Sequence, residues 1–175
     1  LPLCPLSDDL YIGAFVIFGD VELTEVSAKA LLDKAPDFDI LVTAESKGIP
    51  LAHEMARQSG KNTYVLARKA PKLYMKNVIK VEVKSITTAK VQTLYIDEED
   101  EKKLRGKRVL IVDDVISTGE SLHALEALVN RAGGNIVGRM ATLAEGDAIG
   151  LPGISYVQKL PLFDRNGDPI PVKED

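Results

Sequence analysis

Two adjacent carboxylates and a short hydroxyl-rich turn form the segment of this sequence that is best suited to chemistry, V-L-I-V-D-D-V-I-S-T-G-E-S at Val109–Ser121. Its first four residues are apolar and predict a buried strand, so Asp113 and Asp114 are expected to stand exposed where that strand ends. In an open α/β sheet, ligands bind in the crevice outside the carboxyl ends of the strands. Ser117–Gly119 then opens a predicted helix, where unpaired N–H groups and the helix dipole favour a bound phosphate.

The acid pair beside an anion site restricts the kind of ligand. Two carboxylates would repel a phosphate unless they hold something else, such as sugar hydroxyls or a divalent cation. A ribose 5-phosphate meets both demands. The alternative without a ligand is that Asp113 caps the loop and Thr118 caps the helix, as Asp and Thr side chains commonly do.

The elements that must position these residues follow an alternation of short β-branched runs and amphipathic stretches. This alternation is typical of the α/β class, with a parallel central sheet flanked by helices. The expected central strands, each nearly continuous in apolar residues, are Ile40–Thr43, Tyr64–Ala67, Val109–Val112 and Ile136–Ala141. The expected helices are Thr24–Lys34, Ile49–Ser59 and Ser121–Ala132.

A long segment between the second and third expected strands, Lys72–Arg105, contains two alternating runs, Val78–Val83 and Val91–Ile96. Long connections inside a compact domain are usually functional, so we expect a mobile lid here. The alternative is an extra hairpin packed on the edge of the sheet.

The two ends of the chain, about residues 1–20 and 150–175, are expected to build a small hood over the sheet. The first end is rich in apolar and aromatic residues. The second end holds an expected strand at Ser155–Leu160 and a turn of the hairpin type at Asn166 and Gly167.

Length and composition set further limits. A chain of 175 residues with 45% hydrophobic content can bury one core, so a single domain over residues 1–175 is expected. The net charge of −4 and the pI near 5.3 indicate no surface for nucleic acid or for an acidic membrane. The sequence has a lone cysteine, Cys4, and no apolar run near the roughly 18 residues of a membrane span. It starts at Leu1 without methionine or a basic leader, so no signal peptide is expected. Together these features predict a cytoplasmic protein.

The segment Val109–Ser121 resembles the signature by which the type I phosphoribosyltransferases bind phosphoribosyl pyrophosphate (PRPP), an apolar strand, two acids, two apolar residues and a small-T-G loop. The resemblance covers roughly Leu10–Leu160 and is nearest to the purine enzymes of the adenine or xanthine kind. It implies that Asp113 and Asp114 hold the ribose 2′- and 3′-hydroxyls. The residues implied to wrap the 5′-phosphate are Val115, Ile116, Ser117, Thr118, Gly119, Glu120 and Ser121.

The same resemblance implies a pyrophosphate site in the loop after the first core strand. The residues of that loop are Glu45, Ser46, Lys47 and Gly48. Arg68 and Lys69, with Lys72 nearby, resemble the R-K pair that purine enzymes place against pyrophosphate. The alternatives are an ordinary strand-to-helix turn and solvated surface cations.

The base is expected to meet the hood. Phe15 and Phe18 are candidates to stack on a purine ring, with core packing as the alternative, and Lys159 is a candidate donor to a 6-oxo group. Phe18-Gly19-Asp20 resembles the F-R-D of adenine enzymes, but Gly19 replaces the arginine.

Other segments are similar to xanthine enzymes, namely Leu10–Asp20, Ala67–Lys69 and Lys84–Thr88. Ser117 stands where the common hypoxanthine–guanine enzymes carry an aspartate, which argues against that subgroup. We therefore expect a purine substrate, with 6-oxopurines accepted somewhat more readily than adenine.

The activity implied is transfer of the 5-phosphoribosyl group from PRPP to a purine base, with release of pyrophosphate and a purine nucleoside monophosphate for purine salvage. A purine nitrogen would displace pyrophosphate at C1′ through an oxocarbenium-like transition state, and Mg²⁺ held mainly by PRPP oxygens would stabilise the leaving group. Glu82 is the candidate general base, and a homodimer is implied.

Two other functions are compatible with the motif. One is a PRPP-sensing regulatory protein with the same fold and no transferase activity, and the other is a binding module without catalysis. The retention of Lys47, Arg68 and Lys69 and the lack of an appended helix-turn-helix favour the enzyme.

Overall fold

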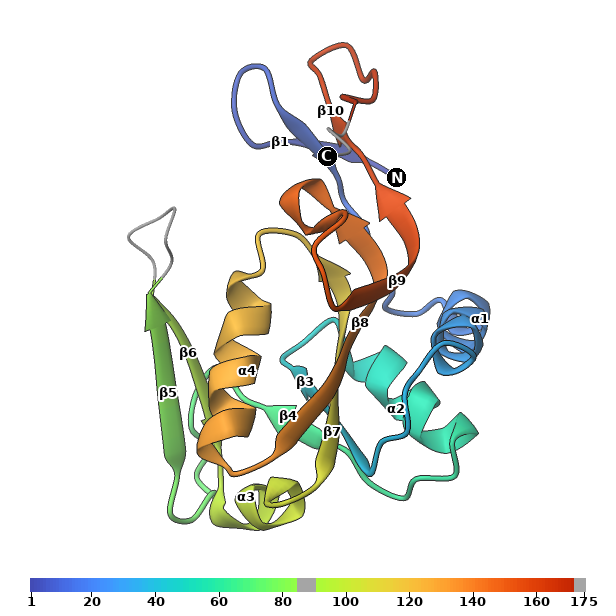
Figure 1. Ribbon diagram of the computed structural model, residues 1–175. Coiled ribbons are helices and arrows are strands. Elements are labelled where there is room, and N and C mark those ends of the chain that lie inside the picture. The colour runs from blue at the N-terminus through green and yellow to red at the C-terminus, as the bar shows by residue number, and fades with distance from the viewer. Residues whose placement is uncertain (85–90, 172–175) are drawn as a thin grey trace.

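The computed structural model describes residues 1–84 and 91–171, and a five-stranded parallel sheet lies at its centre (Figure 1). The strand order is β4-β3-β7-β8-β9, and each neighbouring pair is parallel. The strands are β3 (Ile40–Ala44), β4 (Val65–Ala67), β7 (Arg108–Ile116), β8 (Asn135–Glu145) and β9 (Ile154–Leu160). The expected α/β class is confirmed, and all four expected strands belong to this sheet.

Three strands differ from the expectation in ways that affect the site. β7 and β8 continue past their expected ends to Ile116 and Glu145, so the acid pair lies within β7 rather than after it. The expected hood strand Ser155–Leu160 is instead part of β9, the edge strand of the central sheet beside β8. It belongs there because its side chains pack on both sides, Tyr156 against one apolar core and Leu160 in the other.

Helices cover both faces of the sheet. Because successive side chains of a strand point to opposite faces, each central strand packs against both helix layers. Leu110 and Val112 of β7 pack on the face covered by two helices, while Val109 and Ile111 pack on the face covered by a third. The first two are α1 (Val21–Leu32) and α2 (Ile49–Gln58), and the third is α4 (Glu120–Arg131). Burial on both faces explains why the central strands are continuous in apolar residues.

The long segment between β4 and β7 forms an antiparallel hairpin and a short helix. These elements are β5 (Ile79–Lys84), β6 (Val91–Ile96) and α3 (Glu98–Leu104). Val81 and Leu94 are buried in the core beneath α4, and Tyr95 exchanges two backbone hydrogen bonds of 2.8 Å with Arg68. The described part of this segment therefore forms a packed hairpin, which was the alternative to the expected lid. Residues 85–90, which include most of the Lys84–Thr88 resemblance and the tip of the expected lid, lie outside the described residues.

A second sheet is built from both ends of the chain and stands at one end of the central sheet (Figure 1). Its strands, paired antiparallel in the order β1-β2-β10, are β1 (Leu3–Pro5), β2 (Tyr11–Gly13) and β10 (Leu162–Phe163). The predicted turn follows β10: the carboxylate of Asp164 accepts hydrogen bonds from the N–H groups of Asn166 and Asp168 at 2.8 and 2.9 Å. This sheet is the hood of the expected fold.

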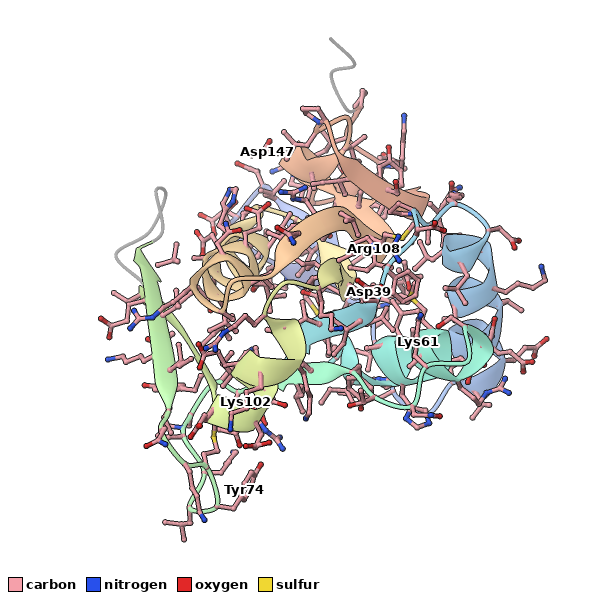
Figure 2. The ribbon with its side chains drawn as sticks, turned by 60° about the horizontal axis from the view of Figure 1, so that its bottom comes forward. Asp39, Lys61, Tyr74, Lys102, Arg108 and Asp147 are labelled. Carbon is pink, nitrogen blue, oxygen red and sulfur yellow. The ribbon has the colours of Figure 1, made fainter. Side chains whose placement is uncertain are left out.

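An ion pair fixes the register of β3 and β7 at the end of the sheet opposite the hood. Arg108 and Asp39 lie side by side (Figure 2), and a guanidinium nitrogen of Arg108 is 2.9 Å from a carboxylate oxygen of Asp39. Two more hydrogen bonds join these residues. The backbone N–H of Arg108 donates to the carboxylate of Asp39, and the backbone N–H of Asp39 donates to the carbonyl oxygen of Arg108.

Among residues 1–84 and 91–171, no helix has both the length and the apolar character that a membrane crossing requires.

Candidate active site

A cavity of about 490 Å³ lies between the hood and the carboxyl ends of β3, β7 and β8. One wall carries the acid pair of β7, the β3–α2 loop and the last residue of β8. Residues 12–16 of the N-terminal segment line it as well, together with Leu160, the partner of Glu145 in β9. The cavity thus occupies the place where open α/β sheets bind ligands.

The acid pair is more buried than its position in the sequence suggests. Asp114 is only 3% exposed, so the expectation of two exposed acids at a strand end is wrong for this residue, because β7 continues beyond it. The ammonium of Lys47 lies 3.1 Å from Asp114 Oδ2. That contact is not aligned as a hydrogen bond, and Oδ2 has no other hydrogen-bond partner within the described part of the chain. An oxygen in this state favours a ligand that donates hydrogen bonds.

Asp113 differs from its neighbour in its electrostatics. Burial and the adjacent charge of Asp114 raise the pKa of Asp113 to about 7. Its Oδ1 accepts a hydrogen bond from the backbone N–H of Asp114 at 2.9 Å. The site therefore holds one carboxyl that is readily protonated beside one that is paired with a lysine.

The loop between β7 and α4 forms a small concavity at the start of the helix. Gly119 is the N-cap residue of α4 and has a φ of +77°, a left-handed conformation that glycine adopts without strain. No side chain caps this helix, so the alternative in which Thr118 is the cap is not what forms. A concavity of about 50 Å³ here is lined by Asp113, Leu122 and all seven predicted residues of Val115–Ser121. Uncapped N–H groups at a helix start favour an anion.

The β3–α2 loop (Glu45–Gly48) is packed directly against the acids. A Cβ added to Gly48 would lie 2.3 Å from Oγ1 of Thr43 and 3.0 Å from Oδ1 of Asp113. Only glycine allows this approach. The peptide bond between Glu45 and Ser46 is cis. The loop presents Lys47 to the cavity from the side opposite β8.

The predicted cations split into two groups. Arg68 donates to Glu45 at 2.6 Å, and Lys72 lies 4.0 Å from the same carboxylate, so both are engaged by the loop. Burial opposes the charged form of Glu45, but hydrogen bonds from Lys69 N–H and from Arg68, with the nearby cationic charges, outweigh it and lower its pKa. Lys47 and Lys69 are the cations that line the cavity.

The aromatic candidates differ in position. Phe15 is 8% exposed and lines the cavity, whereas Phe18 is 48% exposed and is not part of its lining. Lys159 and Glu82 are also absent from that lining. Glu82 stands next to the buried Val81 on β5, and its exposed side chain pairs with Lys80.

Glu145, the last residue of β8, is a lining residue that the sequence pattern did not single out. It is 8% exposed, and burial raises its pKa, while the charge of Lys47 acts in the opposite direction. The sequence does contain a clue to Glu145. The mostly apolar residues that continue to Ala144 predict a longer strand, which would end at this carboxylate.

Similarity to known proteins shows the family of this chain. A profile of the phosphoribosyl transferase domain matches residues 21–171. An adenine phosphoribosyltransferase of Rhodococcus jostii is 33% identical over 83% of this chain and 78% of that protein. One from Thermotoga petrophila is 41% identical over 58% of this chain, and the match spans only 56% of that protein's own length.

Solved structures show the same fold. The adenine phosphoribosyltransferase of Rhodothermus marinus has a TM-score of 0.63 and 27% identity, over 77% of this chain and 78% of that chain. The enzyme of Thermoanaerobacter pseudethanolicus has a TM-score of 0.66 and 22% identity, over 82% of this chain and 84% of that chain. With a domain match that covers most of the sequence and a sheet, hood and cavity arranged as described, the chain belongs to the phosphoribosyl transferase domain family.

Proposed function

We propose that this protein transfers the 5-phosphoribosyl group of PRPP to a purine base and releases pyrophosphate and a purine nucleoside monophosphate. The observation that carries the proposal is the convergence of three features on the main cavity and the concavity that adjoins it: a buried acid pair, an uncapped helix start and a lysine-bearing loop. PRPP requires all three, because it carries ribose hydroxyls, a 5′-phosphate and a pyrophosphate.

Each feature has a separate role in this proposal. The oxygens of Asp113 and Asp114 accept hydrogen bonds from the ribose 2′- and 3′-hydroxyls, which fits the unsatisfied Oδ2 of Asp114. The loop of residues 115–121 binds the 5′-phosphate through backbone N–H groups and hydroxyls. The Glu45–Gly48 loop and Lys69 surround the pyrophosphate, and Arg68 supports the loop through Glu45.

The chemistry then depends on charge. As the bond from C1′ to pyrophosphate breaks, negative charge grows on the leaving group, and Lys47 and Lys69 are placed to stabilise it. The carboxylates of Asp113 and Asp114 are oxygen donors of the kind that Mg²⁺ prefers, and the ion would add positive charge at the pyrophosphate. In residues 1–84 and 91–171, no group of three or more His, Cys, Asp or Glu side chains could hold a metal, so PRPP oxygens would supply the remaining ligands.

The hood end of the cavity is proposed to take the base, with Phe15 against the ring. The relatives described above are adenine phosphoribosyltransferases, which makes adenine the first base to test. The expected preference for 6-oxopurines was based on Gly19, on the segments similar to xanthine enzymes and on Lys159 as a donor. Of these, Lys159 is not part of the cavity lining. The proposal includes a cytoplasmic homodimer, which fits the free thiol of Cys4 and the exposed apolar side chains of Val16 and Val21.

A base panel tests the function directly. The purified chain would be incubated with PRPP, Mg²⁺ and one of adenine, guanine, hypoxanthine, xanthine or uracil, and nucleotide formation would be measured. We expect a nucleotide product with at least one purine and none with uracil. Tight PRPP binding without transfer to any base would instead support the PRPP-sensing regulator.

A further inference from the structure

The carboxylate of Glu145 is the one buried acid of the cavity that the roles above leave unused. It is 8% exposed, and the described residues offer it no hydrogen bond and no ion pair within contact distance. Lys47 is close enough to influence it electrostatically, but the ammonium of Lys47 is directed at Asp114 and the carbonyl oxygen of Phe15, at 3.1 and 3.4 Å. Its carboxylate opens onto the cavity, so a ligand that displaces water from this site could donate hydrogen bonds to it.

The position of Glu145 along the sheet indicates which part of a ligand it meets. In the register of β7 and β8, Asp113 lies opposite Ala141, so Glu145 stands four residues beyond the level of the acid pair, or about 13 Å along the strand. On its other side it pairs with Leu160, which lines the cavity together with hood residues. Leu160 and the hood residues, which the proposed function assigns to the base, therefore share this end of the cavity with Glu145.

We propose that Glu145 determines base specificity by accepting a hydrogen bond from the exocyclic amino group of a 6-aminopurine. This inference rests on the proposed function. A carboxylate accepts hydrogen bonds only, so it fits an amino group and is repelled by the oxygen of a 6-oxo group. Phe15 supplies apolar contact to the ring at the same end of the cavity, and Glu145 supplies the polar selection.

Substitution of Glu145 by Leu tests this role, because Leu is of similar size and has no atom that can accept a hydrogen bond from the amino group. We expect kcat/KM for adenine to fall by about tenfold or more, and the ratio of adenine to hypoxanthine to shift toward hypoxanthine. The KM for PRPP should stay within about twofold of the wild-type value. Asp147→Asn is the matched control, since Asp147 is two residues away, is exposed (Figure 2) and should leave every parameter unchanged.

Several outcomes would overturn the inference. An equal loss with every base, or a rise in the KM for PRPP alone, would indicate a structural or PRPP-binding role. If Glu145→Leu did not fold, the wild type would decide: adenine should compete for the site about tenfold better than unsubstituted purine, and equal competition would refute the amino contact. If the Glu145 variant transferred to adenine and hypoxanthine in the same ratio as the wild type, only this inference would be refuted. If the wild type transferred to no base, the proposed function would be refuted as well.

Discussion

The substitution Gly48→Ala tests the packing of the β3–α2 loop against the acid pair. Gly48 has φ and ψ of −70° and −11°, values that alanine adopts freely, so backbone strain plays no part. The added methyl group would lie 2.3 Å from Oγ1 of Thr43, a fully buried side chain, and 3.0 Å from Oδ1 of Asp113. Van der Waals contact requires the loop to withdraw by about 1 Å.

The expected cost has two parts. Overpacking of this kind lowers the free energy of unfolding by about 1–3 kcal/mol. A displacement of about 1 Å in a loop that positions a reacting group can reduce the rate about 100-fold. Urea unfolding measures the first effect, and kcat with PRPP and adenine measures the second.

A double variant separates the steric cause from other effects. Thr43→Ala removes the oxygen that lies nearest to the new methyl group, so Thr43→Ala/Gly48→Ala should be less impaired than the two single variants predict together. Wild-type stability and activity in Gly48→Ala, or strictly additive losses in the cycle, would refute the steric argument.

Two further predictions follow from the site. The folded protein holds the proton of Asp113 up to about pH 7, whereas the unfolded chain loses it near pH 4, so the stability of the empty protein should fall as pH rises through this window, by at most about 4 kcal/mol. Asp113→Asn should flatten that slope in thermal unfolding at pH 5 and pH 8, and an unchanged slope would count against the raised pKa. Phe15→Leu should raise the KM for the base by severalfold, while Phe18→Leu should not, because only Phe15 lines the cavity; equal effects on both would contradict this assignment.

Much of the fold could be predicted from the sequence because strands buried on both faces leave a continuous apolar signal. Val109–Val112 shows this clearly, since its alternate residues fill the two cores on either side of the sheet. The loop at Val115–Ser121 was also predictable, because a glycine in the left-handed conformation before a helix is a local requirement.

Other features depend on contacts that a linear pattern does not contain. Asp114 is buried because β8 and the loop bearing Lys47 flank β7 beyond the apolar run. Glu145 reaches the cavity only because β8 extends as far as β9 and the hood. Glu82 was predicted as the general base because it lies in the expected lid. Side chains alternate along β5, and that of Glu82 points to the exposed face.

The central claim is that the acid pair holds the ribose of PRPP during transfer to a purine. The most direct measurement is adenine-dependent release of pyrophosphate from PRPP in the presence of Mg²⁺, compared between the wild type and Asp113→Asn/Asp114→Asn. Each lost charged hydrogen bond costs about 1.5–3 kcal/mol, so the double variant should lose at least about 100-fold in kcat/KM for PRPP while it stays folded by circular dichroism. Release by the folded double variant at the wild-type rate would contradict the account.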